Sequence, residues 1–335
     1  MTFNYSAVGF IGLGVMGFPM VENLYKKLPE SVRICVFDVS KSAVEELSSR
    51  TNGRAEACSS SKEVAEKSVN AMSAHQDPQD VVITMVPEGS HVRSVYLTPD
   101  TGVLATDLSN KLLIDCSTID TATSLEVADA ISKQYPTASF YDAPVSGGSL
   151  GAQKATLTFM VGCAESDPKF PMLQDLLGMM GNPDAIFACG GQSLGLTAKL
   201  CNNYCSGLIA IATSEAMNIG MKSGMDPRVL AKVFHASTAQ SAICDKWCPV
   251  PGICPEAPAS KGYQGGFKIQ LMRKDFGLAV DAAKRVGVEL ALGEKGLETY
   301  TAAMNDPRCK DLDSRVVYRH LGGDEHWAER FEQNP

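Results

Sequence analysis

A lysine and an asparagine on one helical stretch are the residues best placed to do chemistry in this sequence. Lys199 follows Gly195 by four residues and Asn203 follows Lys199 by four, so a helix stacks all three on one face. The surrounding run, residues 193–223, lacks proline and is apolar on nearly every side, which predicts a buried helix. A buried ammonium costs several kcal/mol unless it is paired or gives up its proton. The alternative is a lysine whose stem is buried while its head reaches solvent.

A glycine-rich turn near the N-terminus could bind a dinucleotide. It stands between an apolar run, residues 7–13, and a helical pattern that extends to about Leu28. Its residues are Gly12, Leu13, Gly14, Val15, Met16 and Gly17. The next apolar run ends in Asp38, at about the 20-residue spacing where an acid accepts hydrogen bonds from the adenosine ribose. A carboxylate repels a 2′-phosphate, so Asp38 favours NAD over NADP, although Lys41 weakens this preference. The alternative is a tight turn without a ligand.

Further candidates stand where predicted strands end, because ligands of doubly wound sheets bind beyond the carboxyl ends of the strands. The residues that fall at this edge are Val86, Pro87, His91 and Thr118. His91 could equally be a surface histidine at a helix start. After another predicted strand come Ser146, Gly147 and Gly148, whose backbone amides could bind a carboxylate. The same three residues could also form only a glycine-rich turn.

The elements that would position these residues alternate between strand and helix, which predicts an α/β fold with a Rossmann-type, doubly wound parallel sheet. The predicted strands are residues 7–13, 32–37, 81–86, 112–115, 138–141, 157–161 and 185–188. The helices predicted between them include one from Ser90, residues 121–134 and residues 167–180.

After about residue 193 the sequence pattern predicts mainly helices. Predicted helices there are residues 227–236, 270–286 and 291–303. We therefore predict an NAD-binding Rossmann domain at residues 1–192 and an all-helical domain at residues 193–335, joined by the long interdomain helix at residues 193–223. We expect the polar tail from Gly322 onward to fray and residues 71–80 to form a polar surface insertion.

Composition excludes several classes of protein. The 335 residues are 44% hydrophobic, enough for two cores, and the net charge of -8 argues against nucleic acid or an anionic membrane as partner. No apolar run is long enough to span a bilayer, and residues 1–7 are too short and uncharged to predict a signal or transit peptide. The 11 cysteines are typical of buried thiols in a reducing compartment. Cys244, Cys248 and Cys254 lack a CxxC pair, so we predict no metal site.

Four separated motifs together resemble the β-hydroxyacid dehydrogenase family, which is related to 6-phosphogluconate dehydrogenase. The similarity extends over residues 8–321. Residues 10–20 resemble the family's dinucleotide signature, residues 142–148 its substrate loop, Gly195 to Asn203 its catalytic helix, and Lys274 to Ala279 its second cofactor motif. Residues 201–218, 249–252 and 263–267 are similar to the 3-hydroxyisobutyrate branch of the family in particular.

The resemblance implies reversible, NAD-dependent oxidation of 3-hydroxyisobutyrate to methylmalonate semialdehyde, a step of valine breakdown, in a cleft between the two domains. It implies that Lys199 is the general acid/base, that Asn203 bonds the substrate hydroxyl or carboxylate, and that Lys274 closes over the nicotinamide. Ser146, Gly147 and Gly148 would hold the carboxylate. Burial and the positive nicotinamide ring would both favour the neutral amine of Lys199. The family also implies a homodimer or homotetramer, in the mitochondrial matrix of a eukaryote or the cytoplasm of a bacterium.

Two other functions fit parts of the sequence. One is a related dehydrogenase or reductase that acts on tartronate, glyoxylate or succinate semialdehyde; the other is a non-catalytic NAD(P)-binding homologue, in which the lysine would be absent. The chain departs from the family pattern at three positions. Ala155 replaces a usual glycine, Phe276 a usual leucine, and His91 an asparagine that is common beside the cofactor.

Overall fold

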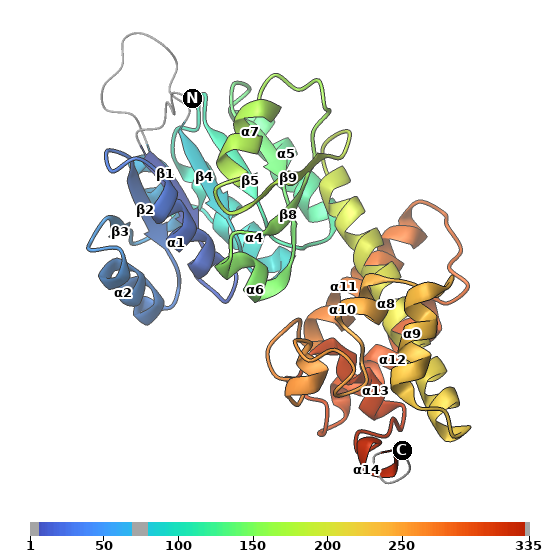
Figure 1. Cartoon of the computed structure of the whole chain (residues 1–335). Coiled ribbons are helices and arrows are strands. Elements are labelled where there is room, and N and C mark those ends of the chain that lie inside the picture. Colours follow the sequence, from blue (N-terminus) through green and yellow to red (C-terminus); the bar gives the residue numbers. More distant parts are fainter. Residues whose placement is uncertain (1–6, 69–79, 332–335) are drawn as a thin grey trace. The chain divides into compact units, whose positions relative to one another are not determined.

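The computed structural model describes residues 7–68 and 80–331 (Figure 1). The chain divides into two compact units, residues 1–199 and residues 200–335, and each is described by itself below. The polar insertion predicted at residues 71–80 lies outside the described residues, apart from Asp80. Within the described ranges, no helix is long and apolar enough to cross a membrane.

The first unit is built on a six-stranded parallel sheet with the strand order β3-β2-β1-β4-β5-β6. Its strands are β1 (Ala7–Ile11), β2 (Arg33–Phe37), β3 (Ala55–Ala57), β4 (Val81–Thr84), β5 (Leu112–Asp115) and β6 (Ser139–Asp142). The central strands are buried on both faces, which explains why they read as uninterrupted apolar runs. The predicted fold class is confirmed.

Helices cover this sheet and enclose two hydrophobic cores. They are α1 (Gly17–Lys27), α2 (Lys41–Arg50), α3 (Ser61–Lys67), α4 (Gly89–Leu97) and α5 (Thr121–Gln134), with a 3-10 turn at Val103–Ala105. Alternate residues of β1 enter different cores, because successive strand side chains point to opposite faces: Phe10 belongs to one and Ile11 to the other. Side-chain caps begin three of the helices: Ser40 caps α2, Ser60 caps α3 and Asp120 caps α5.

The last three strands of the first unit form a separate small sheet, which the sequence did not predict. They are β7 (Val145–Ser146), β8 (Leu157–Val161) and β9 (Gly181–Ala188), in the order β7-β8-β9, and β7 runs antiparallel to β8. Only Ala143 and Pro144 separate β6 from β7, and a parallel crossover needs about a dozen residues. The chain therefore leaves the large sheet here, and the helices α6 (Gly148–Gln153) and α7 (Phe170–Leu177) follow.

The long helix, α8 (Leu194–Lys222), forms nearly where it was predicted. Its predicted burial on all sides is wrong for one face. Leu194 is 44% exposed and Ile219 68% exposed, and the side chains of Cys201 and Cys205 are exposed as well. The expectation of buried thiols fails at these two cysteines. Apolar residues on every side of a helix do not show which side is covered.

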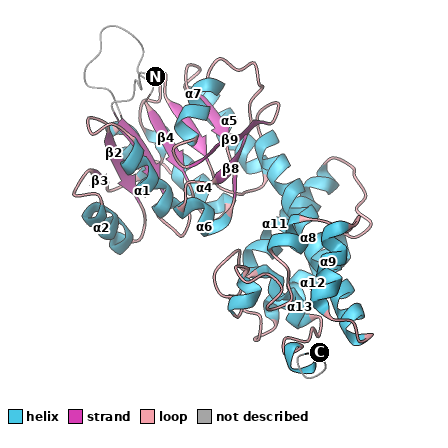
Figure 2. Cartoon of the chain, in the orientation of Figure 1, coloured by secondary structure: helices cyan, strands magenta, loops and turns pink. Residues whose placement is uncertain are grey.

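The described part of the second unit is helical and contains no named strand, as Figure 2 shows. Besides α8 it contains α9 (Pro227–Ala236), α10 (Ala242–Lys246), α11 (Ile269–Arg285), α12 (Gly293–Asn305), α13 (Val317–His320) and α14 (Ala328–Phe331), with 3-10 turns at Pro258–Lys261 and Ser314–Val316. Its larger core includes Phe276, Tyr300 and Tyr263. A smaller core joins Met217 and Met221 of α8 to Trp327.

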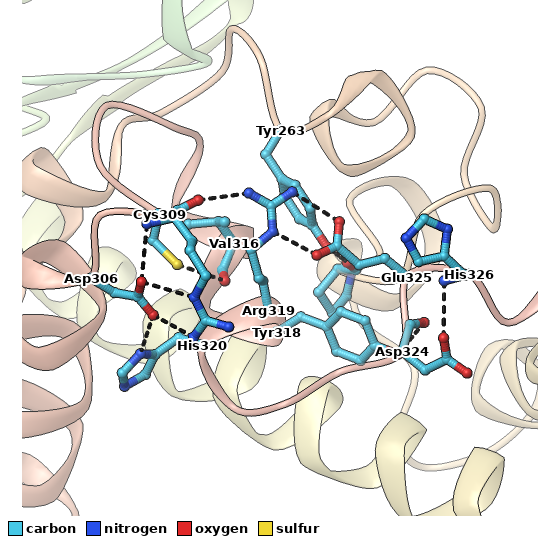
Figure 3. A network of polar contacts seen from close by, with 12 residues as sticks. Tyr263, Asp306, Cys309, Val316, Tyr318, Arg319, His320, Asp324, Glu325 and His326 are labelled. Atoms are coloured by element: carbon cyan, nitrogen blue, oxygen red, sulfur yellow. Dashed lines mark hydrogen bonds and ion pairs between the residues drawn. The ribbon is translucent and has the colours of Figure 1, made fainter.

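The tail is packed as far as the structure describes it, so the prediction of fraying from Gly322 onward is wrong for this part. The guanidinium of Arg319 holds the Glu325 carboxylate through two bonds, of 2.6 and 2.9 Å, and lies over the ring of Tyr263 (Figure 3). Trp327 is 6% exposed, and its indole donates to the Pro251 carbonyl. Polar composition predicted a loose end, but one tryptophan and one bidentate ion pair hold it in place.

Candidate active site

The glycine turn between β1 and α1 has the geometry of a dinucleotide-binding turn. Gly12 has a φ of 98°, and a side chain there would overlap the backbone oxygen of Met85. A side chain on Gly17 would overlap the backbone oxygen of Gly12, so α1 packs directly against the turn. A Cβ on Gly14, in contrast, would meet nothing within 4 Å. The turn is therefore closed on two sides and open at Gly14, where backbone can approach a pyrophosphate.

Asp38 stands beside this turn. Its Oδ2 accepts the amide of Leu13 at 2.6 Å, and its Oδ1 accepts the amide of Ser40 at 2.7 Å. These bonds hold the carboxylate at the end of β2, next to the glycines. Of the other predicted turn residues, Val15 exposes 75% of its surface and Met16 packs partly against the core.

The remaining predicted cofactor residues lie after β4 and β5. The Val86 amide donates to the Ser117 hydroxyl at 2.9 Å, which ties the ends of these two strands together. Thr118 follows Ser117 and is half-buried, whereas Pro87 and His91 are exposed, His91 in the first turn of α4. Ser117 was not predicted from the sequence as a site residue. It is fully buried and also donates its amide to Asp115.

The predicted substrate loop lies at the end of β7 and the start of α6. Gly147 has a φ of 134° and Gly148 a φ of 62°, and side chains rarely adopt either conformation. Ser146 is half-buried in β7. The two glycines allow the backbone to turn sharply here, so that amides at the start of α6 remain available to a ligand.

Lys199 lies on α8 and is 6% exposed. Its position on a buried face agrees with the prediction. The first turn of the same helix is held by Asp142, whose carboxylate accepts the amides of Ser193 and Leu196. Asp142 lies in the motif that resembles the substrate loop, but its contact with α8 was not predicted from the sequence.

Asn203 and Lys274 meet at one carboxylate in the second unit. The amide nitrogen of Asn203 donates to Asp275 at 2.6 Å, and Lys274 forms an ion pair with the other oxygen of Asp275 at 3.2 Å. Asp275 is 2% exposed. This carboxylate was also missed by sequence analysis, although it lies next to Lys274 in the motif. It orients the amide of Asn203 and pairs with the ammonium of Lys274.

Two buried carboxylates stand side by side at the ends of β5 and β6, where Asp115 and Asp142 are in register. Burial raises the pKa of Asp115 to about 7. The hydrogen bonds from the Ser117 hydroxyl and amide lower this pKa, and the nearby charge of Asp142 raises it. Burial also raises the pKa of Asp142, but backbone amides at Leu196 and Ser193 oppose this. Asp142 is therefore the better stabilised anion of the two.

Two of the three departures from the family pattern have a structural explanation. Ala155 has a φ of 52°, so this position still adopts the conformation in which glycine is usual. Phe276 is fully buried, and its ring centroid lies 4.8 Å from that of Tyr204 and 5.6 Å from that of Tyr300. Glycine at position 296 makes room for it, since a side chain there would overlap the phenyl ring. Phenylalanine in place of the usual leucine therefore changes the packing of this core and not the cofactor motif's surface.

Comparison with known proteins agrees with this geometry. Residues 7–191 match the NAD-binding domain of 6-phosphogluconate dehydrogenase, and residues 193–321 match the NAD-binding domain of NADP-dependent 3-hydroxyisobutyrate dehydrogenase. The probable mitochondrial 3-hydroxyisobutyrate dehydrogenase of Dictyostelium discoideum is 42% identical over 96% of this chain and 92% of its own. The chain belongs to the 3-hydroxyisobutyrate dehydrogenase family. The resemblance drawn from four motifs is confirmed, as is the prediction of a dehydrogenase that uses NAD.

Two other similar proteins have L-serine in their description. The structure of Mycobacterium tuberculosis 3-hydroxyisobutyrate dehydrogenase with L-serine has a TM-score of 0.80 to this chain and is 32% identical, covering 95% of this chain and 99% of that one. An NAD-dependent L-serine dehydrogenase of Pseudomonas aeruginosa is 38% identical over 88% of this chain and 90% of its own.

Proposed function

We propose that this protein catalyses the reversible, NAD-dependent oxidation of 3-hydroxyisobutyrate to methylmalonate semialdehyde, and so acts in valine breakdown. The observation that carries the proposal is the burial of Lys199 on α8 in a chain of this family, with Asn203 one turn further along the same helix. The non-catalytic alternative requires the lysine to be absent, and this chain has it.

In the proposed mechanism, Lys199 Nζ takes the hydroxyl proton of the substrate. Burial disfavours the charged form of an amine, so a buried lysine can be neutral and accept a proton near pH 7. The carbon that carries the hydroxyl loses its hydrogen with the electron pair, and the carbonyl of the semialdehyde forms. NAD, when bound, supplies the acceptor for this hydride. In the reverse direction Lys199 returns the proton to the carbonyl oxygen.

The other site residues bind and orient. We assign the substrate carboxylate to Ser146, Gly147 and Gly148, whose amides add no charge of their own. Asn203, held by Asp275, is suited to bond the substrate hydroxyl or carboxylate. Lys274, paired with the same Asp275, is assigned to both the nicotinamide end of the cofactor and the substrate.

The glycine turn, Gly12 to Gly17, is assigned to the pyrophosphate and Asp38 to the adenosine ribose. Val86, Pro87, His91 and Thr118 are assigned to the nicotinamide half, since they follow β4 and β5. The carboxylate of Asp38 supports a preference for NAD over NADP, because a 2′-phosphate would stand against a negative charge.

L-serine is the second candidate substrate, because an L-serine dehydrogenase is among the relatives and the related Mycobacterium tuberculosis structure is one with L-serine. Both substrates are small acids with a hydroxyl on the carbon that would lose hydride. They differ at one group, which is a methyl in 3-hydroxyisobutyrate and a charged ammonium in L-serine. Steady-state assays of both acids, each with NAD and NADP, would rank them, and a higher kcat/KM for L-serine would overturn the preferred substrate.

The test of the mechanism is the variant Lys199→Ala. We expect kcat to fall by about a hundredfold or more, because the acid–base group is removed. Lys222→Ala is the matched control, since this lysine is exposed at the far end of the same helix. Normal turnover by Lys199→Ala, in a preparation that binds NAD, would refute the assigned role.

We also propose a homo-oligomer, a dimer or tetramer. Support comes from exposed apolar side chains on α8 and α9, where Ile219, Val229 and Val233 are 68%, 50% and 51% exposed. For a eukaryotic source we propose the mitochondrial matrix, because eukaryotic relatives are named mitochondrial.

A further inference from the structure

The buried carboxylate of Asp142 holds the first turn of the helix that carries Lys199. Its Oδ1 accepts the amide of Ser193 at 2.7 Å, and its Oδ2 accepts the amide of Leu196 at 2.8 Å. Asp142 is 1% exposed. Leu196 and Lys199 are about one turn apart on α8, so a displacement of the first turn moves the lysine with it.

Two glycines allow the same turn of α8 to pack closely against β8 and Asp142. A Cβ on Gly195 would overlap the backbone oxygen of Met160 and would lie 2.8 Å from Asp142 Oδ2 and 2.9 Å from the Gly162 nitrogen. A side chain on Gly162 would overlap the same carboxylate. The first turn of α8 thus rests directly on the end of β8 and on Asp142, with two glycines where side chains would separate them.

Asp142 also begins the segment that leads to the substrate loop. It is the last residue of β6, and β7 ends only four residues later at Ser146. One short segment therefore carries both the candidate carboxylate-binding loop and the group that fixes the catalytic helix.

We propose that Asp142 is a positioning residue: through the first turn of α8 it sets where the Lys199 amine stands relative to the loop Ser146–Gly148. The inference rests on the proposed acid–base role of Lys199. Asp142 itself touches neither the proton nor the hydride in this scheme. Its task is to keep the distance between the group that takes the proton and the group that holds the substrate.

The test compares Asp142→Ala and Asp142→Asn with the control Asp167→Asn. Asp167 also accepts one backbone amide, of Lys169, and a second bond, from the Tyr141 hydroxyl, but neither donor belongs to α8. Turnover is expressed per NADH-binding site, so that unfolded protein does not count. We expect Asp142→Ala to lower kcat by about tenfold to a hundredfold, because misplacement by about 1 Å can cost a hundredfold. Asp142→Asn should recover part of this, since its amide oxygen still accepts a bond.

Two readouts separate positioning from a general loss of structure. NADH affinity should stay within about threefold of wild type, because the cofactor is assigned to the turn at Gly12–Gly17. Hydrogen exchange at the amides of Ser193 and Leu196, measured without substrate, should become faster in both Asp142 variants and stay unchanged in Asp167→Asn. Gly195→Ala should lower kcat in the same way, and combining it with Asp142→Ala should cost no more than the worse single change.

The inference is overturned if kcat per NADH-binding site is unchanged in Asp142→Ala. It is also overturned if kcat falls while exchange at residues 193–196 stays as in wild type. Failure of the proposed function looks different: the wild-type protein would then not oxidise 3-hydroxyisobutyrate, whereas the exchange experiment would still report on Asp142. The kinetic comparison would in that case use L-serine.

Discussion

The three glycines of the turn between β1 and α1 have different tasks, which their surroundings separate. Gly14 faces open space, whereas Gly17 packs on the backbone oxygen of Gly12. The glycine at position 14 thus leaves room for a ligand, whereas the glycine at position 17 allows α1 to pack closely on the turn.

Gly14→Val should therefore fold with unchanged stability and weaken NAD binding by more than about tenfold, or about 1.4 kcal/mol. Gly17→Ala should instead lower the midpoint of urea unfolding, because its methyl group forces α1 away from the turn. Calorimetric titration with NAD and urea unfolding of both variants would check this. Equal affinity for NAD in Gly14→Val and wild type would contradict the assigned cofactor site.

Between elements, the contact of α11 with α12 depends on a matched pair of unusual residues. Phe276 of α11 fills space that Gly296 of α12 leaves open, and Leu208 of α8 lies beside them, at 3.3 Å from where a Cβ on Gly296 would stand. The departure from leucine at position 276 is compensated within the same core.

Gly296→Ala should destabilise the protein by about 1 to 3 kcal/mol through overpacking. The double variant with Phe276→Leu should be more stable than the sum of the two single changes predicts, because leucine gives the methyl group room. Gly277→Ala is the control: it is a helical glycine of α11 whose Cβ would meet only ordinary contacts, the nearest at 3.6 Å. Urea unfolding of the four proteins gives the coupling energy, and strict additivity would show that the two positions are independent.

For the whole molecule, the buried pair Asp115 and Asp142 links stability to pH. The folded-state pKa of Asp115, about 7, lies above its ordinary value of 3.8, because burial disfavours the charged form. Among the described residues, its Oδ2 has no hydrogen-bond partner. The native protein therefore holds a proton here that the unfolded chain releases near pH 4. The stability that this proton contributes is complete below that pH and is lost as pH rises through 7.

Asp115→Asn removes this titration while its amide oxygen can still accept the Ser117 amide. Between pH 5 and pH 8 the wild type should lose roughly 3 kcal/mol more unfolding free energy than Asp115→Asn, because the loss extends over about two pH units at about 1.4 kcal/mol each. Urea unfolding at the two pH values measures the difference. Parallel pH dependence in the two proteins would mean that Asp115 is not the titrating group.

The sequence predicted the parts of this molecule that local patterns determine. Short apolar runs located the central strands, and the spacing of Lys199 and Asn203 placed both on one helix. It did not predict β3, whose three residues, Ala-Glu-Ala, carry no strand pattern. The roles of Asp142 and Asp275 were also missed, because their partners lie 51, 54 and 72 residues away and only folding brings them together.

The uninterrupted course of α8 limits where this chain can be lengthened. Lys199 and Asn203 are assigned to different compact units, but no loop separates them, since both lie inside one helix of 29 residues. One extra residue between them would rotate everything that follows by about 100° and turn the amide away from the amine. An insertion in α8 leaves the residues that follow it on their faces of the helix only if it adds close to a whole number of turns, as seven residues do.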